Sequence, residues 1–78
     1  MKIQDFIDVL KENLEIEDID VSEDTDLRTL ENYDSMAVLS IIALIDEHFG
    51  KKLKGEEFKT ITTVKSLMIL IGMENFEK

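Results

Sequence analysis

The feature that most constrains this chain is an apolar stretch from Ser35 to Phe49, followed directly by Gly50. Its β-branched residues are compatible with a strand, but a run this long without polar–apolar alternation favours a buried helix. A serine at the start and a glycine at the end are typical helix boundaries, and Gly50 is expected to adopt the left-handed conformation that ends a helix. The pattern places Val38, Ile42, Ile45 and Phe49 on one face of this helix, with Ile41 beside them, and predicts that this face is buried.

Shorter helical patterns flank this stretch. Between Lys2 and Leu14, apolar residues recur at the spacing of an amphipathic helix. Near the other end, Thr62 or Thr63 is a suitable N-cap for a helix from Val64 to about Gly72. The segment between them, Gly55–Lys59, is long enough for one helical turn that presents Phe58, and the tail from Met73 to Lys78 extends or frays.

These elements predict an all-α fold, a small four-helix bundle of three main helices and one short helix with a long first loop. At 78 residues the chain is expected to form one domain, 1–78, with a single modest core. The loop, Glu15–Tyr33, has aliphatic residues spaced as anchors and a segment, Thr25–Leu30, compatible with a short helical turn. The anchors are Ile16, Ile19, Val21, Leu27 and Leu30, and the predicted core contains Phe6, Leu10, Val38, Ile42, Ile45, Phe49 and Leu67.

The charge balance excludes several classes of partner. The chain has 18 acidic and 9 basic residues, a formal net charge of −9. Such a surface opposes binding to nucleic acids and to anionic membranes. The polar N-terminus is unlike a signal peptide, and no apolar run is long enough for membrane insertion. We therefore expect a cytoplasmic monomer that is steered toward basic patches on other proteins.

The residues of a catalytic centre are missing. The chain has no cysteine and one histidine, His48. If Ser35 and His48 lie at opposite ends of one helix, about 20 Å separates them, which rules out a dyad. No glycine-rich phosphate loop is present. We predict that this protein is not an enzyme and that it has no metal centre.

The acidic loop imitates a calcium-binding loop. Its oxygen-bearing side chains match an EF-hand pattern, with Leu27 at the apolar eighth position. Thr25 stands where that loop needs glycine for a sharp turn, and the apolar stripe of the preceding helix lapses after Leu14. A Ca²⁺ sensor or non-carrier helical interaction module that uses residues 20–31 remains the alternative function. The matching positions are Asp20, Ser22, Asp24, Asp26 and Glu31.

Ser35 is the remaining candidate. Alone, the pair Asp34-Ser35 indicates only a helix N-cap. Yet a hydroxyl at a helix start is exposed, and the free N–H groups and dipole there would favour a phosphodiester attached to it.

With its surroundings, this stretch resembles the acyl carrier protein family and its peptidyl and aryl carrier relatives. The likeness rests on Asp34-Ser35-Met36, on the helix end Asp46-Glu47-His48-Phe49-Gly50, and on Ile61-Thr62-Thr63-Val64 before the last helix. It covers essentially the whole chain.

The resemblance implies that a phosphopantetheinyl transferase attaches 4′-phosphopantetheine to Ser35. The terminal thiol of this arm would hold acyl or aminoacyl groups as thioesters. Asp34 would support the attachment site, Met36 would contact partner enzymes beside it, and Ile61 would flank the arm. The implied partners are loading ligases, ketosynthases and acyltransferases of lipid, polyketide or other secondary biosynthesis.

Three departures from the family pattern stand out. Asn32 replaces a glycine common three residues before the serine, and Asn tolerates the left-handed conformation that such a turn can need. Glu31 falls where many members have leucine, and Leu30 would fill in. The outer face of the helix after Ser35 also lacks acids in its first turns, which predicts a specialised carrier recognised by apolar fit. The expected partner surface is Met36, Ala37, Ser40, Ala43, Asp46 and Glu47.

Overall fold

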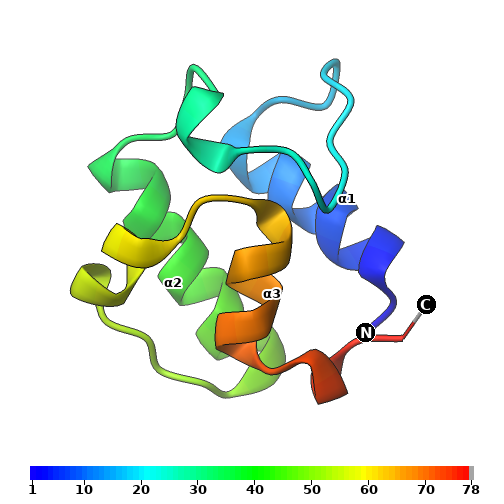
Figure 1. Ribbon diagram of the computed structural model, residues 1–78, viewed down its shortest axis with the longest axis vertical. Coiled ribbons are helices and arrows are strands. Elements are labelled where there is room, and N and C mark those ends of the chain that lie inside the picture. The colour runs from blue at the N-terminus through cyan, green and yellow to red at the C-terminus, as the bar shows by residue number, and fades with distance from the viewer. Residues whose placement is uncertain (78) are drawn as a thin grey trace.

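The computed structural model describes residues 1–77 and has three α-helices and three short 3₁₀-helices (Figure 1). The expected all-α fold with three main helices is confirmed, and the expected short fourth helix is the 3₁₀-helix η2. Lys78, the end of the expected tail, lies outside the described residues. The elements are α1 (Ile3–Leu14), η1 (Leu27–Thr29), α2 (Ser35–Phe49), η2 (Gly55–Thr60), α3 (Val64–Ile71) and η3 (Met73–Asn75).

The helix boundaries follow local capping chemistry. Gly50 ends α2 in the left-handed conformation, with φ 67°, as predicted. Of the two candidate caps of α3, the structure selects Thr63, whose hydroxyl accepts a hydrogen bond from the Ser66 N–H. Glu15 ends α1 with φ 58°, a left-handed conformation at a non-glycine residue that the sequence pattern did not reveal.

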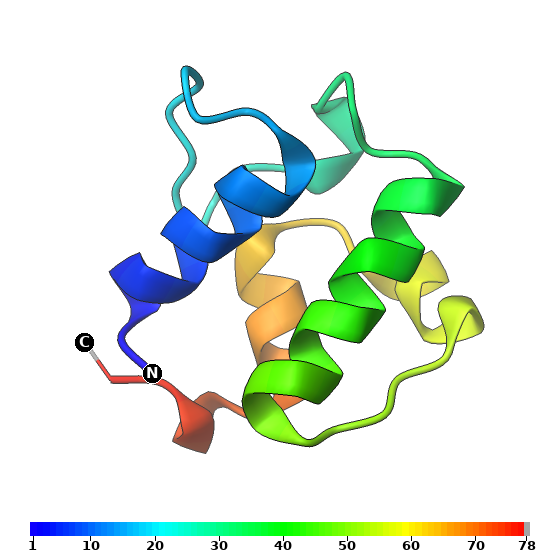
Figure 2. The ribbon, with the colours of Figure 1, turned by 180° about the vertical axis from the view of Figure 1, so that it is seen from behind.

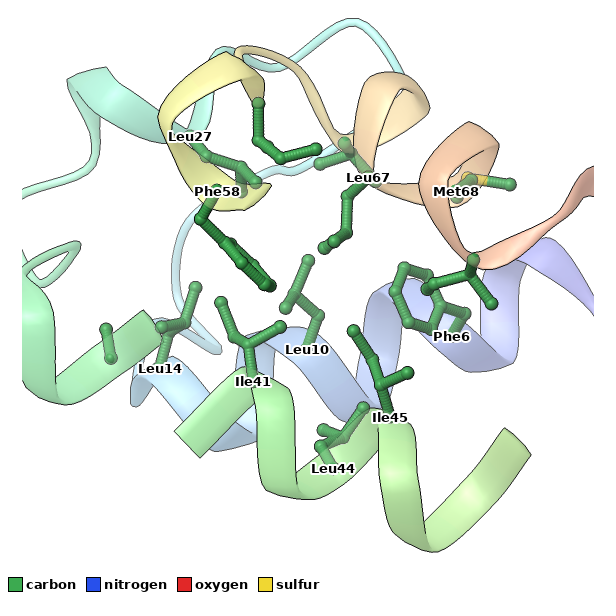
Figure 3. Close-up of a cluster of buried hydrophobic side chains, with 14 of the residues drawn as sticks. Phe6, Leu10, Leu14, Leu27, Ile41, Leu44, Ile45, Phe58, Leu67 and Met68 are labelled. Atoms are coloured by element: carbon green, nitrogen blue, oxygen red, sulfur yellow. The ribbon is translucent and has the colours of Figure 1, made fainter. Parts of the chain in front are cut away.

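The three α-helices enclose one hydrophobic core (Figure 3). Figure 2 shows α1 and α2 in the foreground with α3 behind them. Each α-helix supplies four buried residues, and the connecting segments close the ends of the core. The core residues outside the α-helices are Ile16, Leu27, Leu53, Phe58 and Ile61.

The predicted buried face of α2 was partly wrong. Ile45 is fully buried, but Val38, Ile42 and Phe49 are only partly buried at the edge of the core. Because α2 is apolar on nearly every side, periodicity alone does not fix its rotation, and packing against α1, η2 and α3 decides it. The residues that α2 buries are Ala37, Ile41, Leu44 and Ile45.

The long loop is held by anchors and by backbone hydrogen bonds to the start of α3. The N–H of Leu27 donates to the carbonyl of Thr62 at 2.7 Å, and the N–H of Val64 donates to that of Thr25 at 3.0 Å. The exception among the expected anchors is Ile19, which is 39% exposed. The loop is therefore a fixed frame that leads the chain from α1 to α2 (Figure 1).

The two ends of the described chain lie side by side (Figures 1 and 2). The Ile3 N–H donates to the Glu77 carbonyl at 2.9 Å, so the segment after η3 is paired with the N-terminus and does not fray. Phe76 packs its ring against Phe6 and Phe49, with centroids 5.1 Å and 5.3 Å away. This aromatic cluster joins α1, α2 and the C-terminal segment.

Candidate functional site

Ser35 is the first residue of α2, and its side chain is exposed. Asp34 is the N-cap, in an extended conformation, and its carboxylate accepts a hydrogen bond from the Ala37 N–H at 2.9 Å. The cap removes one of the free N–H groups of the first turn and fixes where the helix begins. Within residues 1–77, no protein group forms a hydrogen bond with the Ser35 hydroxyl, so the exposed hydroxyl is not held by the rest of the chain.

The position of Ser35 suits a covalently attached phosphate. The positive end of the α2 dipole lies at Ser35, and backbone N–H groups of the first turn are available to anionic oxygens. A phosphodiester on the Ser35 hydroxyl would therefore lie at the end of α2 that stabilises negative charge. The residues present thus fit a phosphate-linked prosthetic group.

Asn32 holds the approach to Ser35 through its side chain. Its amide nitrogen donates to the carbonyl of Leu14, the last residue of α1, at 2.9 Å. This carbonyl is one of those that a helix end leaves without an intrahelical partner. Asn32 does not adopt the left-handed conformation that its residue type tolerates: in the part of the chain that the structure describes, Glu15 is the sole non-glycine residue with positive φ.

Tyr33, between Asn32 and Asp34, carries an unusual hydroxyl. The oxygen is buried, and it has no hydrogen-bond partner within the described residues. Burial raises the pKa of Tyr33 above its ordinary value, so the side chain is neutral under physiological conditions. Sequence patterns gave no indication of this unpaired group two residues before the candidate site.

Of the residues expected beside the site, Met36 lies on the surface and Ile61 does not. Met36 is 72% exposed, next to Ser35. Ile61 is 4% exposed, because it follows η2 and its side chain completes the core. The expectation that Ile61 flanks an attached arm stays a prediction; in this structure its side chain is part of the core.

The expected partner surface is exposed at five of its six positions. Ser40, Ala43, Asp46 and Glu47 are exposed along α2, as is Met36. Ala37 is 8% exposed and belongs to the core, so its expected place on the outer face was wrong. Leu39, which is 60% exposed, was missed; it lies one turn after Ser35 on the same face, and that i, i+4 spacing could have identified it.

The acidic loop does not assemble an EF-hand geometry. The Asp26 carboxylate accepts hydrogen bonds from the Arg28 backbone and guanidinium, at 2.9 Å and 2.8 Å. The Arg28 hydrogen bonds hold the pKa of Asp26 below its usual value. Among residues 1–77, no group of three or more acidic or histidine side chains is placed to hold a metal ion. His48 is exposed in the last turn of α2, at the opposite end from Ser35.

The comparison with protein families identifies the class. A family model described as the phosphopantetheine attachment site matches residues 4–71. The chain therefore belongs to this family of acyl-carrier-protein-like domains, which carry a covalently attached 4′-phosphopantetheine group. No curated protein and no solved structure matches the chain. No helix within residues 1–77 has the length and apolar character needed to cross a bilayer.

Proposed function

We propose that this protein carries acyl or aminoacyl groups on a 4′-phosphopantetheine arm attached to the Ser35 hydroxyl. The observation that supports this proposal most strongly is the exposed Ser35 at the capped start of α2, inside the family match. When bound, the group supplies a terminal thiol that holds its cargo as a thioester. The chain itself, which has no cysteine, supplies no such thiol.

Residues of this chain have distinct tasks in that function. Ser35 provides the oxygen that a phosphopantetheinyl transferase links to phosphate, and Asp34 fixes the helix start from which that oxygen projects. Asn32 ties the preceding segment to the end of α1. The result is an exposed hydroxyl at a fixed helix end, where a modifying enzyme can reach it.

The exposed face beside Ser35 is proposed to receive the enzymes that act on the arm. Met36 and Leu39 form an apolar surface next to the attachment point, and Ser40 and Ala43 continue the surface of α2 without charge. Acids appear only at Asp46 and Glu47. Docking therefore depends on apolar fit near Ser35, while the net charge of −9 attracts basic partner surfaces over longer range.

The attachment is tested by intact mass after incubation with coenzyme A and a promiscuous phosphopantetheinyl transferase. We expect a gain of one phosphopantetheinyl group in the wild type and none in Ser35→Ala. The matched control is Ser22→Ala, which removes an exposed serine of the first loop, outside the proposed docking surface, and leaves modification intact. Absence of a mass gain in the folded wild type would contradict the proposal.

The specialised role is tested by exchanging the general carrier of its cell for this protein in an enzyme assay. A carrier recognised by apolar fit should support a standard fatty-acid synthase reconstitution less well than the general carrier of its cell. Equal rates with the two carriers would show that this protein is a general carrier. Leu39→Ala, at an exposed position, should reduce turnover by a cognate enzyme without changing the free energy of unfolding by more than about 0.5 kcal/mol.

A further inference from the structure

The outer side of α3 combines exposed apolar residues with lysines. α3 lies in the foreground of Figure 1, whereas α1 and α2 form the side seen in Figure 2. Ile69 is 59% exposed, Leu70 is partly buried, and Met73, just after the helix, is 39% exposed. Lys65 is exposed and precedes Ile69 by one helical turn, so the two lie on the same side of α3. We use the name α3 face for Lys51, Lys65, Ile69, Leu70 and Met73.

Lys51 reaches this surface from the connection between α2 and η2. Its ammonium group donates to the carbonyls of Leu70 and Ile71, at 2.9 Å and 3.4 Å. These carbonyls belong to the last turn of α3, where a helix leaves its carbonyls without intrahelical partners and where positive charge is favourable. The hydrogen bonds therefore fix a positive charge at the C-terminal end of the α3 face.

The charge of this part of the chain is opposite to that of the rest. Residues 50–72 contain five lysines and two glutamates, a formal charge of +3, whereas the remaining residues include four basic and 16 acidic ones, a formal charge of −12. None of the five lysines forms an ion pair with a carboxylate within residues 1–77. Their charges are therefore available to another molecule. These lysines are Lys51, Lys52, Lys54, Lys59 and Lys65.

An exposed apolar surface beside lysines is complementary to a partner that is apolar and acidic. At physiological ionic strength, exposed charges act over about 8 Å. The molecule is much wider, at 28 × 27 × 20 Å. A short acidic segment on the α3 face would thus interact mainly with lysines, whereas a flat anionic bilayer would also extend toward the acidic residues around that face. The charge distribution therefore favours a narrow acidic segment of a protein over a membrane.

We propose that the α3 face is a second docking surface, which binds a short acidic segment of a partner protein. Apolar residues of that segment would pack on Ile69, and its carboxylates would lie beside Lys51 and Lys65. This surface belongs to a different helix from the α2 surface proposed for the enzymes that act on the arm, and it selects the opposite charge. The inference does not depend on modification of Ser35, so it applies to the unmodified protein as well.

The test is an NMR titration of the unmodified protein with a synthetic amphipathic peptide of leucine and glutamate. We expect amide shifts centred on Lys65, Ile69 and Leu70, and a dissociation constant that rises with salt concentration. A peptide with glutamine in place of glutamate should bind more weakly. No binding of the acidic peptide, equal binding of both peptides, or shifts centred on Met36 and Leu39 would overturn the proposal.

Two matched pairs of variants locate the peptide. Ile69→Ser should weaken binding by about fivefold through lost apolar contact, whereas Leu39→Ser, at a residue of α2 that is equally exposed at 60%, should not weaken it. Lys65→Gln should weaken binding about two- to fivefold, the range for an exposed ion pair. Lys11→Gln makes the same charge change on α1 and should have a smaller effect. Equal effects within either pair would overturn the proposal; if Ile69→Ser does not fold, Ile69→Ala replaces it.

Two other occupants of the α3 face are distinguished by separate measurements. Vesicles of phosphatidylglycerol should not bind the protein in a sedimentation assay, and binding that Lys65→Gln weakens would instead assign the face to an anionic membrane. A second copy could offer its acidic loop, where Ile19 is 39% exposed. We expect spectra that do not change with protein concentration. Shifts at both Ile19 and Ile69 on concentration would reveal self-association and overturn the proposal.

Discussion

The side chain of Asn32 donates a hydrogen bond to the carbonyl of Leu14, across 18 positions of the chain, at 2.9 Å. This contact joins the end of α1 to the segment that presents Ser35. The segment before Ser35 is fixed by this side-chain hydrogen bond, with no left-handed residue at Asn32.

We predict that Asn32→Ala lowers the free energy of unfolding by about 1 kcal/mol and slows modification of Ser35. The reason is that the Leu14 carbonyl loses its partner and the approach to Ser35 is no longer fixed. Urea denaturation and the rate of mass gain measure the two effects. The control is Asn75→Ala, which breaks the bond from Asn75 to the Ile71 carbonyl far from the site, where Lys51 also donates to that carbonyl. It should lower stability less and leave the rate unchanged; equal rates for both variants would argue against a positioning role for Asn32.

We predict that Tyr33→Phe is neutral or stabilises the protein by about 1 kcal/mol at pH 7. Burying a hydroxyl without a partner costs free energy, and phenylalanine removes the hydroxyl while keeping the ring. Thermal unfolding of the two proteins provides the comparison. A clear loss of stability would mean that the hydroxyl has a partner in solution.

The pH dependence of Tyr33 gives a second, direct measurement. Burial raises the pKa of Tyr33 in the folded protein above 10.0, so folding favours the neutral side chain over the ionised one. The stability that depends on the neutral form is complete below the unfolded pKa and is lost as pH rises through the folded pKa. Tyr33 is the one tyrosine of the sequence, so absorbance of tyrosinate reports this group alone. A titration midpoint at or below the ordinary value would contradict burial of the hydroxyl.

We predict that Asp26→Ala destabilises the protein at neutral pH and that the difference from wild type shrinks in acid. The hydrogen bonds from Arg28 lower the pKa of Asp26 from 3.8, so its contribution is present above that value and is lost as pH falls through the folded pKa. Melting temperatures of Asp26→Ala and of the wild type from pH 2 to 7 measure this difference in stability. A difference that does not change with pH would show that the ionised form of Asp26 is not what stabilises η1.

We predict that Phe6→Ala costs about 3–5 kcal/mol, the range for a fully buried phenylalanine. Phe49→Ala should cost less, about 2 kcal/mol, because Phe49 lies at the edge of the core and contacts Phe6 with centroids 6.1 Å apart. Urea denaturation gives both values. A larger loss for Phe49→Ala would restore the view that its ring lies in the centre of the core.

A pair of alanines tests the rotation of α2. Ala37→Leu should cost about 1–3 kcal/mol because the larger side chain overpacks a buried site. Ala43→Leu, at an exposed position of the same helix, should change stability by less than about 0.5 kcal/mol. Chemical denaturation gives the free energy of unfolding of both variants. Equal losses would mean that α2 is rotated from the orientation described.

The sequence by itself determined where α2 begins and ends and which serine begins it. Asp34 and Gly50 act on backbone groups within a few residues of themselves, so their roles can be predicted locally, whereas the choice of Thr63 as the cap of α3 and of Glu15 as the end of α1 came from the structure. The expected helical turn at Phe58 was confirmed for the same reason.

Only the tertiary structure decided which side of α2 faces the core. α2 is apolar on nearly all sides, so contacts with other elements select Ala37 and Ile41 as buried and leave Leu39 exposed. The bond from Asn32 to Leu14 and the unpaired Tyr33 hydroxyl likewise depend on segments brought together by folding. Periodicity and capping describe neighbours along the chain, whereas these features arise between residues that are distant in sequence.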